Sequence, residues 1–108
     1  MSINLGKFRK AISKGRFEWR QHTLERLVQR QISQEQVIAV LRRGFIIEEY
    51  LADKPYPSAL FYGRILNKVP LHVVAAFDER NQWVYIVTVY TPDLKYFESD
   101  YKTRRMKK

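Results

Sequence analysis

The hydrophobic pattern changes its period at Gly44, and this change constrains the fold more than any other feature of the chain. Before Gly44, apolar residues recur at helical spacing; after it, they form short runs rich in β-branched and aromatic residues, separated by turn residues. Short runs joined by tight turns are typical of an antiparallel sheet built from hairpins. The sequence therefore predicts an α+β fold with two amino-terminal helices packed on a four-stranded antiparallel sheet.

A start signal at Ser33 separates the two predicted helices. The first spans about residues 23–31, and its apolar side consists of Leu24, Leu27 and Val28. Ser33 is a good N-cap for the second helix, and Gln36 three residues later completes a capping box. The buried stripe of this helix is formed by Val37, Ile38, Val40 and Leu41. Gly44 is expected to end it.

The strands are predicted at residues 45–50, 59–66, 71–77 and 83–90. The last two are apolar on both faces, which indicates the central pair of the sheet. A loop of residues 79–81, with Asn81 in the left-handed conformation, would place His72 opposite Thr88 and diagonal to Tyr90. The carboxyl-terminal segment 93–108 is expected to form a short docked helix ending in a loose tail.

The length of 108 residues is typical of a single domain, here expected over residues 1–108 with a core at about 17–100 and basic ends. The chain has no apolar run near the roughly 20 residues of a membrane span and no signal-peptide core, so we expect a cytoplasmic protein with no membrane partner. It has no cysteine and two histidines, which makes a metal site hard to assemble. We expect neither metal nor cofactor.

The charge indicates a polyanionic partner, RNA foremost, or an acidic protein. Twenty Lys and Arg oppose eleven Asp and Glu, giving a net charge of +9. One basic cluster contains Lys7, Arg9, Lys10, Lys14, Arg16 and Arg20; the other contains Lys102, Arg104, Arg105, Lys107 and Lys108. The two clusters would flank a phosphate-binding surface if the ends of the chain converge, whereas the simpler alternative is a solvated cationic surface.

Two histidines are candidates for acid–base chemistry. His72 interrupts an apolar strand, where a buried imidazole needs hydrogen-bond partners that Thr88 and Tyr90 could supply. His22 and Arg26 are one helical turn apart on the polar side of the first helix. The alternatives are a satisfied core histidine at position 72 and a surface histidine at position 22.

RNA cleavage without a metal needs a base, an acid and cations that stabilise the transition state. We expect His22 and His72 to be the acid–base pair, Arg26 to steady the phosphate, and Tyr90 to position or protonate it. The candidate substrate contacts are Arg64, Thr88, Arg104 and Arg105. Glu48 and Glu49 lie on alternate faces of one predicted strand, so only one can point toward a given site, and either could serve as a base there. The commoner alternative is that one is exposed to solvent and the other pairs with an arginine such as Arg64.

Several segments together resemble one protein family. They are His22-x-x-x-Arg26, Arg30-Gln31-Ile32-Ser33 with Val37, Tyr56-Pro57-Ser58, and residues 70–74 and 87–93. In this order they resemble the bacterial domain-of-unknown-function family 4258 (DUF4258), roughly from residue 17 to residue 100. That family is similar in its helix-then-sheet layout to the RelE and BrnT type of ribonuclease toxin.

The resemblance implies a RelE-like (BECR-like) fold and metal-independent RNA cleavage restrained by an acidic antitoxin protein. The alternatives are a non-catalytic nucleic-acid-binding domain and an interaction module that docks an acidic protein.

Overall fold

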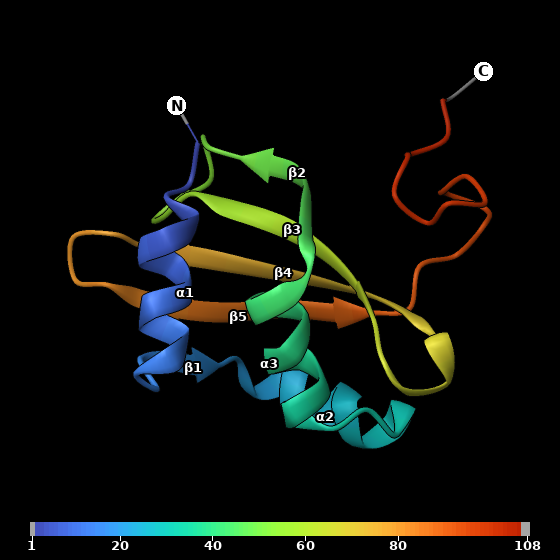
Figure 1. The fold of residues 1–108 in the computed structure, drawn as a ribbon, viewed down its shortest axis with the longest axis horizontal. Helices are drawn as coiled ribbons and strands as arrows, with labels where there is room; N and C mark the ends of the chain where they lie inside the picture. Colours follow the sequence, from blue (N-terminus) through green and yellow to red (C-terminus); the bar gives the residue numbers. More distant parts are fainter. Residues whose placement is uncertain (1, 107–108) are drawn as a thin grey trace.

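The computed structural model describes residues 2–106 and contains one five-stranded mixed sheet and three α-helices (Figure 1). The helices are α1 (Leu5–Ser13), α2 (Gln21–Arg30) and α3 (Gln34–Arg43). The strands are β1 (Phe17–Trp19), β2 (Phe45–Tyr50), β3 (Ser58–Arg64), β4 (Pro70–Asp78) and β5 (Trp83–Tyr90), and a 3₁₀ turn, η1 (Leu66–Lys68), precedes β4. The strand order is β1-β5-β4-β3-β2, with β1 parallel to β5 and the other neighbours antiparallel.

Alternation along β4 separates the two faces of the sheet. Its odd-numbered side chains are almost completely buried in one core with helix residues of α1, α2 and α3; they are Leu71, Val73, Ala75 and Phe77. Burial of a side chain as large as Leu71, Val73 or Phe77 contributes about 1.5–3 kcal/mol of transfer free energy. The even-numbered residues, His72 among them, therefore point to the other face, here called the second face. The sheet thus has a helix-covered face and a second face that carries His72.

The predicted architecture of two helices on a four-stranded antiparallel sheet is wrong, although the α+β class is right. The basic amino-terminal stretch forms α1, which buries Phe8, Ala11 and Ile12, and Asn4 caps it by accepting the Lys7 N–H at 3.0 Å. The short strand β1 then pairs in parallel with β5 at the edge of the sheet. The sequence did not predict α1 because lysines and arginines are interspersed among its apolar residues. It did not predict β1 because a strand of three residues is too short to show a pattern.

The predicted register of the central hairpin is also wrong. The loop spans residues 79–82, and Gln82 rather than Asn81 takes the left-handed conformation, with φ of 53°. Asn81 is held in the turn because its backbone N–H and its Nδ2 donate to the Asp78 carboxylate at 3.1 and 2.8 Å. A bulge between Val74 and Ala75 shifts the register once more. As a result, His72 lies directly opposite Tyr90.

Both ends of α3 lie where the sequence predicts them. The reciprocal Ser33–Gln36 capping box is present, with bonds of 3.0 and 2.9 Å. Gly44 ends the helix, but in an extended conformation with φ of −78° rather than a left-handed one. Glycine is required there because a Cβ would stand 2.6 Å from the Val40 carbonyl oxygen and would also collide with the Tyr62 carbonyl of β3. Position 44 requires glycine because α3 and β3 approach each other closely there, and not because the chain makes a left-handed turn.

The carboxyl-terminal segment, residues 91–106, forms turns rather than the predicted helix and docks on the second face of the sheet. Asp93 accepts the Lys95 N–H at 2.8 Å, and Asp100 accepts the Lys102 N–H at 2.9 Å, so carboxylates compete with helical backbone bonds. Phe97 anchors the segment and is only 2% exposed.

The two basic ends do not converge. The amino-terminal cluster lies on and after α1, whose apolar side packs in the helix-covered core, whereas the carboxyl-terminal segment lies on the second face. Lys107 and Lys108 lie outside the described residues. Part of the amino-terminal charge is structural, since Arg9 donates to the Gly44 carbonyl at 2.7 Å and Arg16 to the Asn81 carbonyl at 2.6 Å. Between residues 2 and 106, no helix has the length and apolar character to cross a membrane.

Candidate active site

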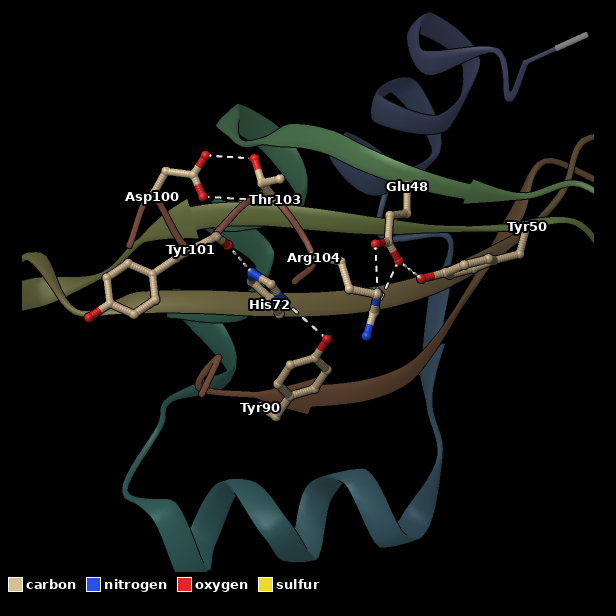
Figure 2. A network of polar contacts seen from close by, with 8 residues as sticks. All are labelled: Glu48, Tyr50, His72, Tyr90, Asp100, Tyr101, Thr103 and Arg104. Atoms are coloured by element: carbon tan, nitrogen blue, oxygen red, sulfur yellow. Dashed lines mark hydrogen bonds and ion pairs between the residues drawn. The ribbon is translucent and has the colours of Figure 1, made fainter. Parts of the chain in front are cut away.

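His72 lies in the middle of the second face, between Tyr62 on β3 and Tyr90 on β5, its cross-strand neighbours. Its side chain is fully buried, because the carboxyl-terminal segment covers it. The Phe97 ring stands edge-on against the imidazole with centroids 4.6 Å apart. The sequence places a polar ring among apolar neighbours, and the fold provides partners for both of its nitrogens (Figure 2).

The contacts of the imidazole define its tautomer. Nε2 lies 2.6 Å from the Tyr101 carbonyl oxygen, which can only accept, so Nε2 carries the proton. Nδ1 of the neutral ring is then an acceptor, and the Tyr90 hydroxyl donates to it at 3.1 Å. Burial lowers the pKa of His72 below its usual value and outweighs the Tyr101 carbonyl, which favours the protonated form. His72 is therefore a neutral base near pH 7.

A local turn presents the Tyr101 carbonyl to His72. One oxygen of Asp100 accepts the backbone N–H of Lys102 and of Thr103, both at 2.9 Å, and the other accepts the Thr103 hydroxyl at 2.8 Å. The bonds from Thr103 and Lys102 lower the pKa of Asp100 to about 2. Tyr101 adopts a left-handed conformation with φ of 60°, which aims its carbonyl at the ring (Figure 2). The turn thus fixes which imidazole nitrogen faces Tyr90.

An arginine stands beside this pair. Nε and Nη2 of Arg104 donate to the two oxygens of Glu48 on β2, each at 3.0 Å. These bonds lower the pKa of Glu48 and raise the pKa of Arg104, so both groups stay charged. Tyr50 also donates to Glu48, and burial together with this bond raises the pKa of Tyr50 to about 12. Nη1 of Arg104 takes no part in the two bonds to Glu48, so this nitrogen can donate to a ligand.

A hollow of about 420 Å³ opens next to the network. It is lined by Tyr90, Thr91, Asp93, Tyr96, Phe97 and Arg104. Burial raises the pKa of Tyr90, so its phenol keeps its proton for the bond to His72. The Tyr90 oxygen retains a lone pair with which it can accept a ligand proton. The hollow therefore presents a phenol backed by a neutral imidazole, a guanidinium group and aromatic walls.

Of the four predicted catalytic residues, the structure brings His72 and Tyr90 together, and it places Arg104, predicted as a substrate contact, beside them. It leaves His22 and Arg26 apart from them. Both are exposed on α2, which packs by Leu27 in the helix-covered core, whereas His72 is on the second face. A mechanism in which the two histidines share one cleft therefore has no geometric basis.

The orientation of α2 differs from the prediction. Thr23 and Leu27 are its buried residues, while Val28, predicted to be apolar core, is 80% exposed. Thr23 can be buried because its hydroxyl donates to the Val87 carbonyl at 2.7 Å. This bond ties the helix to β5 and leaves the neighbouring His22 in solvent.

The remaining predicted contacts lie around the site rather than in it. Arg64 is exposed and donates to the Lys68 carbonyl at 2.7 Å, with its guanidinium 5.8 Å from the Tyr101 ring. Thr88 is half-buried on β5, opposite Val74. Arg105 donates to the Leu94 carbonyl at 2.6 Å and pairs with Glu98 at 3.1 Å.

Sequence reasoning identified Arg104 as a substrate contact but missed its pairing with Glu48 and the contacts of Phe97 and Tyr101 with His72. It paired a strand glutamate with Arg64, whereas Glu48 binds Arg104, 56 residues away. No pattern among neighbouring residues predicts a contact between residues this far apart in the sequence. The Asp100-x-x-Thr103 spacing, in contrast, is a readable signal for a side-chain-capped turn. It would have indicated a turn instead of a helix.

Comparison with known proteins identifies one family. The model of the family described as Domain of unknown function (DUF4258) matches residues 19–91, about two thirds of the chain. The match begins at the last residue of β1, covers α2 through β5 and includes His22, Arg26, His72 and Tyr90, while Arg104 and the turn at Asp100 lie beyond it. No curated protein and no solved structure matches.

Proposed function

Because the chain belongs to the DUF4258 family, whose description carries no activity, we propose a function from the site itself: metal-independent cleavage of RNA by general base catalysis. One observation carries the proposal. Tyr90 donates to the neutral His72 and at the same time lines an open hollow that also contains Arg104. A phenol in this position can pass a proton from a substrate to the imidazole.

The proposed reaction uses the ribose as its own nucleophile. The 2′-hydroxyl gives its proton to the Tyr90 oxygen as the phenol proton moves to Nδ1 of His72. The 2′-oxygen then attacks the neighbouring phosphorus, the bond to the 5′-oxygen breaks, and the leaving oxygen takes a proton from water. The products are a 2′,3′-cyclic phosphate and a 5′-hydroxyl, and His72 returns its proton to solvent through Tyr90.

Two further groups assist this step. Nη1 of Arg104 would donate to the phosphate oxygens as negative charge develops, and Glu48 would hold the guanidinium in place. The Tyr101 carbonyl would stabilise the imidazolium that forms, because it already accepts from Nε2 at 2.6 Å. A correctly placed base of this kind contributes about 10²- to 10⁴-fold to the rate.

The substrate class follows from charge and from the walls of the hollow. A net charge of +9 favours a polyanion. Tyr96 is 55% exposed and provides an aromatic ring on which an unpaired base can stack. Single-stranded RNA satisfies both conditions and supplies the 2′-hydroxyl that the mechanism requires. In this proposal the protein is a cytoplasmic ribonuclease toxin of the RelE-like kind, restrained by an antitoxin.

A second candidate is a non-catalytic RNA-binding domain. The burial of His72 favours it, because a histidine with both nitrogens satisfied is also a stable core residue. Binding would then rely on the cations and aromatic rings alone, and neither the tautomer of His72 nor the Tyr90 hydroxyl would matter.

Cleavage of a fluorescent single-stranded RNA in EDTA separates the two candidates. We expect the purified protein to cut, and Tyr90→Phe and His72→Gln to lose at least a hundredfold in rate while still binding RNA. His22→Gln is the matched control and should cut at the normal rate, because His22 is exposed on α2. Binding without cleavage by the wild-type protein would establish the second candidate instead.

A further inference from the structure

The outer side of α3 is hollowed around one small residue. Ala39 is exposed on this helix, and three surface hollows meet at it, with volumes of about 430, 430 and 490 Å³. One extends toward β1, one toward the start of β2, and one toward η1. The helix belongs to the helix-covered side of the sheet, and Figure 1 shows it apart from the carboxyl-terminal segment. The surface on either side of Ala39 can therefore receive side chains of a partner.

The walls of these hollows are largely apolar. Phe17, Trp19 and Ile38 line the hollow toward β1 and are only half-buried. On the other side of Ala39, Phe45 is 65% exposed and Leu66 is 76% exposed. Large apolar side chains gathered at one surface mark interaction sites more often than scattered single ones do.

The rim of the same surface is cationic. Arg42, Arg43 and Arg64 line the hollows, and Glu35 is the one acidic residue that does so among the described residues. Over residues 2–106, neither Arg42 nor Arg43 takes part in an ion pair. Two unpaired guanidinium groups beside an apolar depression attract a partner that carries both carboxylates and apolar side chains.

The shape of the surface around Ala39 favours a helical partner. A helix packs on another helix at 8–10 Å between axes, and a small residue at the crossing allows the closer distance. Ala39 is such a residue, and the hollows on its two sides would accept the apolar side chains of a helix laid across α3. The walls combine the aromatic rings of Phe17 and Trp19 with aliphatic side chains such as Ile38 and Leu66, and the apolar side of a helix can pack on both kinds.

We propose that the outer side of α3 is a docking surface for an acidic amphipathic helix of a partner protein. The apolar side chains of that helix enter the hollows around Ala39, and its Asp and Glu residues pair with Arg42 and Arg43. The hollows around Ala39 share no lining residue with the Tyr90 hollow, so the proposal does not depend on catalysis.

The test uses a displayed library of 20-residue helical peptides with a fixed leucine stripe and randomised flanking positions, selected for binding to the full chain. The expected result is enrichment of Asp and Glu at the flanks and at least tenfold weaker binding to Ala39→Arg. Val28→Arg is the matched control, because Val28 is 80% exposed on α2 and the substitution adds the same charge. Nonspecific attraction to a basic protein would affect both variants equally.

Three outcomes would overturn the proposal. The first is a selection that yields no binder, and the second is a set of peptides that bind Ala39→Arg and Val28→Arg equally well. The third is protection of Arg42 and Arg43 from chemical modification by RNA but not by the selected peptides, which would assign this surface to nucleic acid. If Tyr90→Phe loses RNA cleavage but still binds the selected peptides, catalysis and peptide docking are independent. Failure of one of these two proposals then does not contradict the other.

Discussion

Removing the Phe97 ring should uncover His72. The ring is 2% exposed, stands 4.6 Å from the imidazole centroid and lies under the Arg104 guanidinium at 4.7 Å. Truncating such a phenyl group to alanine costs about 3–5 kcal/mol. The Arg104–Glu48 ion pair that also holds the segment to the sheet is partly exposed and contributes about 0–1 kcal/mol. At about 1.4 kcal/mol per tenfold, Phe97→Ala should raise the population of molecules with a detached segment by about two to three and a half orders of magnitude.

The reaction of the histidines with diethyl pyrocarbonate, followed by mass spectrometry, measures this population. His22 is exposed and serves as an internal standard, whereas His72 is fully buried. The reactivity of His72 should rise toward that of His22 in Phe97→Ala. Tyr96→Ala is the control, because Tyr96 lies in the same segment but is 55% exposed. A folded Phe97→Ala variant whose His72 stays unreactive would refute the inference that Phe97 anchors the cover.

Three other predictions concern stability and protonation. Gly44→Ala should lose about 1–3 kcal/mol in urea denaturation, because its Cβ would meet backbone oxygens of α3 and β3, whereas Gly6→Ala in α1 meets no such obstacle and should not destabilise. Ser33→Ala should lose about 1 kcal/mol with the capping box, by the same measurement. Since the pKa of His72 is lowered in the folded protein, only the unfolded chain takes up this proton just below pH 6.5, so the free energy of unfolding should fall as pH drops from 6.5. His72→Gln should flatten that part of the curve.

Features encoded by neighbouring residues could be predicted from the sequence. The Ser33–Gln36 box, the end of α3 at Gly44 and the positions of β2 to β5 follow from capping chemistry and from short β-rich runs. Membership of the DUF4258 family is likewise confirmed. In each of these cases the signal lies within a few residues of the feature it predicts.

Features encoded by distant contacts could not be predicted. The Arg104–Glu48 pair joins residues 56 positions apart, and β1 exists only because β5 offers it an edge. The register at His72 depends on a bulge and on the Asp78–Asn81 turn, each of which moves the pairing by one residue. The sequence identified His72 as an unusual strand residue, but the residues near it in the sequence did not reveal all of its hydrogen-bond partners.

The measurement that tests the central claim most directly is the mass of the products formed from one defined single-stranded RNA in EDTA. Attack by the 2′-hydroxyl through Tyr90 and His72 predicts fragments that end in a 2′,3′-cyclic phosphate and begin with a 5′-hydroxyl. RNA that stays intact, or fragments with a 3′-hydroxyl and a 5′-phosphate, would contradict the account.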